Sequence, residues 1–284
     1  MAKLMYLIFI YHRLNLTPKQ VMAIRSRHTY HLVDRSPWPI LSALFAISLT
    51  VRRVYWFSGG KDVNIFMSML GLYLVRGQWW RDVSREATYL GDHSKVVELG
   101  IRWGMVLFII SEVFFFVSFF WAYFYSSLIP VTVLGSAWPP IGVQAFNPLG
   151  VPLLNSLVLL SSGVSVTWAH HALLTSDGWS AINALSVTVL LGIYFTCLQG
   201  LEYWEASFSF RDRVYGRVFF IATGFHGLHV LVGTKFLFVR AWRLSIGHFR
   251  HRHHTGFEIS AWYWHFVDVV WLFLYIWVYI WGAA

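Results

Sequence analysis

The chain has 284 residues, of which 57% are hydrophobic, 19% aromatic and only 12% charged. Ordinary soluble domains carry about a quarter charged residues, so this composition excludes that class and indicates a protein with several membrane spans. The net charge of +9 does not indicate nucleic-acid binding, because Lys and Arg flank apolar runs and form no basic face. The single cysteine, Cys197, allows no internal disulfide and no cysteine metal cluster, and we expect it to be buried.

The first thirty residues are basic and contain no acidic side chain. A targeting presequence fits this pattern, and so does a basic extension on the negatively charged side of the membrane. No clear cleavage site follows, which favours the extension. We therefore predict a basic N-terminal extension, residues 1–30, and a single seven-helix membrane domain, residues 31–284.

Seven apolar segments are candidates for the roughly twenty residues that cross a bilayer as a helix. They are residues 38–57, 63–75, 103–128, 153–174, 181–203, 214–242 and 257–281. The second is short, and hydropathy alone does not decide whether it spans, tilts or lies in the interface. Near the end of the first, Arg52 and Arg53 would have to extend toward the head groups.

Charge predicts how these segments are oriented. If the N-terminus is inside, the inner loops hold fifteen Lys and Arg residues and the outer loops hold six. This bias fits an N-inside, C-outside arrangement. The polar stretch 76–102 is predicted as an inner loop, and the uncharged, proline-rich stretch 129–152 as a rigid outer cap.

Glu112 is the one charge inside the apolar segment 103–128. An ionised, unpaired carboxylate facing lipid costs several kcal/mol or more, so we expect Glu112 to be protonated, turned toward protein, or solvated by a polar pocket. Two interpretations are equally supported by the residues. One is a proton relay, and the other is a protonated carboxyl bonded to a nearby hydroxyl such as Ser111 or Ser118.

Histidine and aspartate recur inside the later segments. His226 and His229 are three residues apart, as are His265 and Asp268, so each pair shares a helix face. Histidines on different helices could ligate haem or a metal. The residue types favour a second interpretation, a hydrogen-bonded network that bridges helices, in which His265 and Asp268 satisfy each other.

Six polar or aromatic residues in the inner loops are candidates for phospholipid contact, because basic pockets on this side bind anionic head groups. They are Trp80, Arg81, Glu86, His93, Arg243 and His248. A merely solvated charged rim explains the same residues equally well.

Several motifs resemble one family closely and in order. They are HLVDRSPWP at 31–39, QWWRD at 78–82, LFIISEV at 107–113, WPP at 138–140, VTWAHH at 166–171, ATGFHGLH at 222–229 and AWYWHFVDVVWL at 261–272. The family is cytochrome c oxidase subunit III, and the likeness covers about residues 28 to 282. REAT at 85–88 and EYWEA at 202–206 look more like its mitochondrial branch than its bacterial one.

This resemblance implies seven helices, two plus five, with phospholipids in a V-shaped cleft between the groups. It implies a non-redox subunit of the mitochondrial inner membrane, with its N-terminus on the matrix side. Such a subunit stabilises subunit I and supports its proton uptake. Haem and copper would belong to the partner subunits I and II, accessory subunits would also bind, and this chain would hold no metal and no catalytic residue.

The resemblance also bears on single residues. Glu112 matches the family's buried, carbodiimide-reactive carboxylate, and the six inner-loop residues match its lipid-contacting positions. The chain departs from the family's usual residues at Arg35, at the Arg52–Arg53 pair, at Asp92 and at Ile246. A stand-alone proton-coupled transporter using Glu112, and a haem-binding membrane cytochrome, are the alternatives.

Overall fold

The computed structural model describes residues 30–60, 64–130, 135–249 and 253–283, and the regular elements in these ranges are helical. The α-helices are α3 Trp38–Phe57, α4 Asn64–Arg85, α5 Lys95–Leu128, α6 Val151–Leu174, α7 Gly178–Glu205, α8 Arg213–Ser245 and α9 Thr255–Leu274. Short π and 3-10 segments follow α4 (η1, Glu86–Leu90) and α9 (η3, Tyr275–Ile280; η4, Trp281–Ala283). The predicted all-α fold is confirmed, whereas residues 1–29 of the predicted extension lie outside the described residues.

Six helical segments in the described residues are long and apolar enough to cross a membrane: α3, α5, α6, α7, α8 and Thr255–Ala283. Helix α4 is not one of them, because it runs past the apolar segment into polar residues and ends at Arg85. The prediction of a loop over 76–102 was therefore wrong for most of that stretch. Arg, Gln and Glu are good helix formers, so the helix continues where hydropathy stops.

The described chain forms two compact units, one ending at Ile101 and the other comprising Arg102–Ala284. The first contains α3 and α4, and the second contains α6 to α9 with all but the first turns of α5. This grouping agrees with the predicted two-plus-five division. The predicted single domain over 31–284 and the V-shaped cleft stay predictions.

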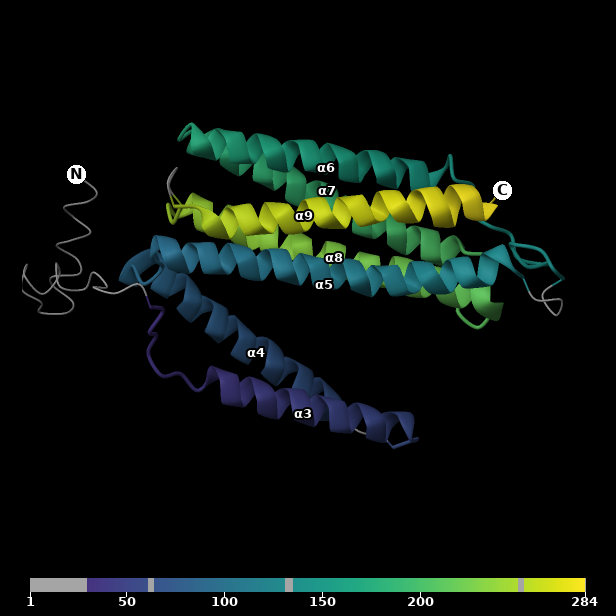
Figure 1. The fold of residues 1–284 in the computed structure, drawn as a ribbon, viewed down its shortest axis with the longest axis horizontal. Coiled ribbons are helices and arrows are strands. Elements are labelled where there is room, and N and C mark those ends of the chain that lie inside the picture. The colour runs from purple at the N-terminus through teal and green to yellow at the C-terminus, as the bar shows by residue number, and fades with distance from the viewer. Residues whose placement is uncertain (1–29, 61–63, 131–134, 250–252, 284) are drawn as a thin grey trace, which may run out of the picture. The chain divides into compact units, whose positions relative to one another are not determined.

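Within the first unit, α3 and α4 lie side by side (Figure 1). Two side-chain bonds join them. The Trp38 indole donates to Asp82 Oδ2 at 2.6 Å, and the hydroxyls of Ser48 and Ser68 meet at 2.9 Å. The bond from Trp38 is the main reason that the pKa of Asp82 lies below its usual value. Polar contacts thus join this helix pair at two separate levels.

Within the second unit, the indole of Trp264 on α9 joins four helices. The ring is fully buried, and its Nε1 donates to Ser162 Oγ of α6 at 2.9 Å. An added Cβ at Gly192 of α7 would lie 2.8 Å from the indole, and one at Gly233 of α8 would lie 2.9 Å from it. Glycine at these positions lets α7 and α8 approach the ring, as small residues do between membrane helices.

Helix α5 is held to this bundle mainly by aromatic side chains. Phe115 and Phe119 approach Phe225 of α8 with ring centroids 5.1 and 5.3 Å apart. Near its end, the Tyr123 hydroxyl donates to the Trp277 carbonyl at 2.9 Å. Large rings span a wider gap between backbones than small residues do, so α5 packs by different rules from α6 to α9.

We predict that Gly233→Val destabilises the second unit by about 1–3 kcal/mol, because the new side chain must displace the buried indole of Trp264. Gly227→Val on the same helix is the matched control, since nothing lies within 4 Å of a Cβ there. Thermal unfolding of the two purified variants measures the difference. Equal unfolding temperatures would show that the indole does not require glycine beside it.

Candidate functional site

Glu112 of α5 faces His229 of α8. The carboxylate Oε2 lies 2.8 Å from the imidazole Nε2, and the side chains are 21% and 9% exposed respectively. The hydroxyls of Ser111 and Ser118 instead donate to backbone carbonyls of their own helix, each at 2.6 Å. The predicted hydroxyl partner of Glu112 was therefore wrong, because helical serines often bond carbonyls one turn back. The carboxylate is turned toward protein, which is one of the three arrangements expected from the sequence.

The second ring nitrogen of His229 determines how this pair holds protons. Nδ1 lies 2.7 Å from the Phe225 carbonyl oxygen, which can only accept, so Nδ1 carries a proton. Glu112 and Nε2 then share one further proton, as a carboxylic acid beside neutral imidazole or as a carboxylate beside imidazolium. Both forms have zero net charge, which avoids the cost of an isolated ion at membrane depth.

Aromatic rings from α5 and α9 surround the imidazole of the pair. The Phe116 ring lies 5.0 Å from the His229 ring in an edge-on arrangement, and the Phe115 ring lies 6.1 Å from it. Tyr263 of α9 stacks at 6.3 Å. These rings exclude water from the imidazole, so its hydrogen bonds to Glu112 and to the backbone act in a medium of low dielectric constant.

The other predicted network residues lie on α8 and α9. His226 is buried, and its Nε2 lies 3.1 Å from the Val267 carbonyl oxygen, which bridges the two helices. Among the described residues no hydrogen bond joins His265 to Asp268, and Asp268 Oδ1 is buried without a hydrogen-bond partner. The expectation that these two satisfy each other was wrong: both side chains lie beside Gly163 of α6 without a hydrogen bond between them.

Two predicted lipid-contact residues, Trp80 and Arg81, lie on the exposed surface of α4. The Trp80 residue is 51% exposed and the Arg81 side chain is 54% exposed. Arg81 donates twice to Asp82 Oδ1, at 3.0 and 3.1 Å. An exposed ring beside a guanidinium is an arrangement found at head-group depth.

Two more, Glu86 and His93, meet a residue that the sequence did not place with them. His31 Nε2 lies 3.7 Å from Glu86 Oε2, and the His31 and His93 rings are 5.3 Å apart. Burial raises the pKa of Glu86, while His31 opposes that rise. His31 belongs to the motif at 31–39, so the family motif was the only sequence signal that pointed to it.

The last two, Arg243 and His248, lie together at the end of α8. Gly247 takes a left-handed backbone conformation with φ +75°, which turns the chain so that the His248 N–H donates to the Arg243 carbonyl at 3.0 Å. The Arg243 guanidinium lies 4.8 Å from the centre of the Phe249 ring. Burial lowers the pKa of His248, and repulsion from Arg243 lowers it further to a smaller extent. This shift favours the neutral form of His248, so Arg243 carries the positive charge at this position.

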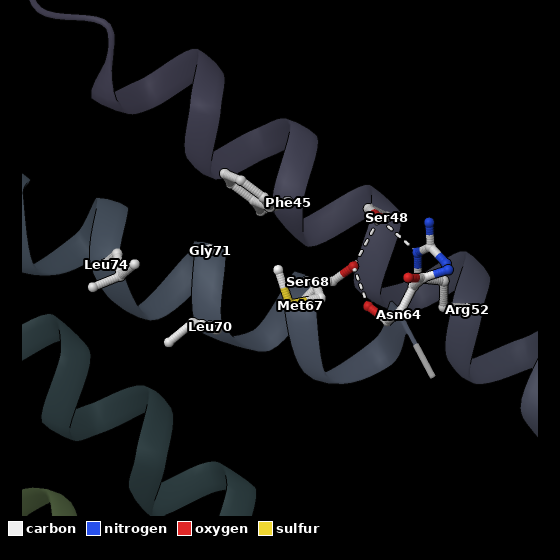
Figure 2. A pocket seen from close by; sticks show the side chains of 9 residues that line it. All are labelled: Phe45, Ser48, Arg52, Asn64, Met67, Ser68, Leu70, Gly71 and Leu74. Carbon is white, nitrogen blue, oxygen red and sulfur yellow. Dashed lines mark hydrogen bonds between the residues drawn. The ribbon is translucent and has the colours of Figure 1, made fainter. Parts of the chain in front are cut away.

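A pocket of about 320 Å³ lies between α3 and α4 (Figure 2). Its lining consists of Phe45, Ser48, Arg52, Asn64, Met67, Ser68, Leu70, Gly71 and Leu74. The Arg52 Nε donates to Ser48 Oγ at 3.1 Å, and Ser48 also meets Ser68. Arg52 thus has a hydrogen-bond partner inside the protein, which the sequence did not predict.

Two further features were not foreseen from the sequence. Arg102 of α5 pairs with Glu258 Oε2 of α9 at 2.7 Å, an ion pair between segments far apart in the chain. Cys197, expected to be buried, is exposed on α7. The prediction of burial was therefore wrong, because on a membrane helix an apolar surface residue can face lipid.

The model of the family described as cytochrome c oxidase subunit III matches residues 28–283. "Cytochrome c oxidase subunit 3" of Ornithorhynchus anatinus is 54% identical over 256 residues, which covers 90% of this chain and 98% of the relative. Its counterparts from Aedes aegypti and Drosophila melanogaster are each 55% identical over 92% of this chain and 100% of the relative. The chain belongs to the cytochrome c oxidase subunit III family.

Membership confirms the family predicted from the motifs. It makes the chain a multi-pass inner-membrane subunit of the respiratory oxidase, complex IV, and hence part of an enzyme built with other oxidase subunits. The six candidate spans agree with that placement.

We predict that Glu112→Gln leaves oxidase assembly largely intact, because the amide keeps the size of the side chain and can donate to His229 Nε2. Glu112→Lys should reduce assembly several-fold, since it places a cation with no carboxylate partner between α5 and α8 at membrane depth. Native gel electrophoresis of solubilised membranes measures assembled oxidase in both strains. If the Lys variant assembles as well as the Gln variant, Glu112 is not held against α8 as described.

Proposed function

We propose that this chain is the non-redox core subunit of the mitochondrial oxidase. In this role it stabilises subunit I, supports proton uptake into it and binds structural phospholipids while electrons pass from cytochrome c to oxygen. Its partners are subunits I and II, accessory subunits and membrane phospholipids, and no nucleic acid. Haem and copper reside in the partner subunits, and the N-terminus lies on the matrix side.

The distribution of burial carries the proposal of a stabilising role. In the 18-residue apolar stretch of each span, no residue of α3 is buried within the chain and only 6% of the α5 stretch is buried. The buried share in the other four spans is 44–50%. An apolar helix face in a membrane must contact either lipid or another protein. A subunit that binds both a large partner and structural lipids requires such uncovered faces.

The pair formed by Glu112 and His229 supports the proposed link to proton uptake. It holds one shared proton at no net charge, and the carboxylate remains partly exposed. A group of this kind can buffer or orient protons for a neighbouring subunit. Its position on α5, one of the two least covered spans, is compatible with that use.

The hydrogen bonds that the histidines of α8 make within the protein favour this proposal over a haem-binding cytochrome. Both ring nitrogens of His229 have hydrogen-bond partners, and the Nε2 of His226 is bonded to the α9 backbone. A haem ligand needs a ring nitrogen directed at the iron. His229 therefore has no ring nitrogen left for iron, and the bond from His226 Nε2 joins α8 to α9.

Purification from the native membrane under mild detergent tests the proposed function. We expect the chain to co-purify with haem-copper subunits, and oxidase depleted of it to lose stability and take up protons more slowly. Proton-coupled transport by the isolated chain in liposomes would instead support a stand-alone transporter. A haem absorption spectrum in the isolated chain would support a cytochrome.

Lipid contact by α4 can be tested at neighbouring tryptophans. We predict that Trp80→Ala oxidase retains fewer tightly bound phospholipids, by roughly one per complex, because the exposed ring no longer anchors a head group. Trp79→Ala is the matched control, since Trp79 is less exposed, at 37% against 51%. Mass spectrometry of lipids extracted from the purified variants measures the difference. Equal lipid content in the two variants would contradict the assignment of Trp80.

A further inference from the structure

Three side chains of the kinds that bind metals meet where α6 ends and α9 begins, and the proposed function uses none of them. His170 lies in the last turns of α6, His254 immediately precedes α9, and Glu258 is in the first turn of α9. One ligand atom from each lies within 4.8 Å of the others. His254 is buried, and the other two are partly buried. These helix ends lie at the same end of the bundle (Figure 1).

Local structure places the three side chains together. The His254 carbonyl accepts the N–H groups of Phe257 and Glu258 at 2.8 and 3.2 Å, so the backbone brings Glu258 one turn above His254. The His254 Nε2 then lies 3.2 Å from Glu258 Oε1. The His170 ring approaches the His254 ring at 5.7 Å and the Phe257 ring at 5.6 Å.

The spacing suits a small tetrahedral ion. Zinc bonds to nitrogen and oxygen ligands are about 2.0–2.1 Å long, so neighbouring ligand atoms in a tetrahedron lie roughly 3.3 Å apart. His254 and Glu258 already have this separation. His170 is within 4.8 Å of both, so a small rotation of its ring completes the set.

The remaining oxygen of Glu258 has its own partner. Arg102 donates to Oε2 at 2.7 Å, which leaves Oε1 directed at His254. A ligating carboxylate that is bonded on its outer oxygen is a common supporting arrangement, because it fixes the orientation of the ligand. The partly buried surroundings also limit competition from water.

We propose that His170, His254 and Glu258 form a binding site for a divalent metal ion of the zinc type, with a fourth position for water. Two imidazoles and one carboxylate suit zinc, which binds nitrogen as well as oxygen ligands. They do not suit calcium or magnesium, which take oxygen ligands. Bound there, the ion joins the end of α6 to the start of α9. The family resemblance implied no metal in this chain, and no short spacing motif links the three residues in the sequence.

The test uses the assembled oxidase, stripped with a chelator and dialysed against graded free zinc. Bound zinc per complex is counted by plasma mass spectrometry. We expect His170→Ala to bind one zinc fewer than the parent, with affinity at this site at least 100-fold weaker. His171→Ala is the matched control, because His171 is exposed and adjacent but outside the cluster. His253→Ala serves the same purpose for His254→Ala.

X-ray absorption at the zinc edge identifies the ligands. The difference between the parent and His170→Ala should show imidazole nitrogen at about 2.0–2.1 Å. Equal zinc uptake by His170→Ala and His171→Ala would overturn the proposal, as would a difference spectrum with oxygen ligands only. If His254→Ala does not assemble, His170→Ala still decides, because that side chain makes ring contacts rather than an ion pair. None of these outcomes bears on the proposed oxidase role.

Discussion

The buried indole of Trp264 is the constraint on which the packing of the second unit depends. One ring meets α6 through Ser162 and requires glycine at positions 192 and 233 of α7 and α8. Membrane helices gain little from apolar burial alone, since lipid is equally apolar, so close contact must come from shape and hydrogen bonding. A single large side chain seated among small ones provides both. Its Nε1 also needs a partner at this depth, which the Ser162 hydroxyl supplies.

Helix α5 follows a different design, and the difference explains why Glu112 lies on it. Its rings, among them Phe115 and Phe119, keep its backbone farther from the bundle, so a carboxylate and an imidazole fit between α5 and α8. A closely packed helix would leave no room for that pair. The polar contact in turn specifies which face of α5 meets His229, because rings alone tolerate rotation.

Much of this fold could be predicted from the sequence, but its pairings could not. The lengths of the apolar segments predicted six of the membrane helices. The polar continuation of α4 was missed, because hydropathy reports how apolar a segment is and not whether it is helical. Glu112 could be recognised as a lone charge in an apolar run. Its partner His229 is 117 residues away, and only tertiary packing selects it over Ser111 or Ser118. Likewise, Glu258 was not singled out, because its ion-pair partner Arg102 lies on α5, far from it in the chain.

The pair of Glu112 and His229 has a consequence for how an energised membrane acts on it. Moving a full charge through a potential of 100 mV changes its energy by about 2.3 kcal/mol. A proton shared across 2.8 Å crosses at most about a tenth of a 30 Å hydrocarbon core, so the potential shifts its position by only about 0.2 kcal/mol. Voltage therefore leaves this proton nearly unaffected. Its place between carboxylate and imidazole is governed by the rings and hydrogen bonds around it, whether the membrane is charged or at rest.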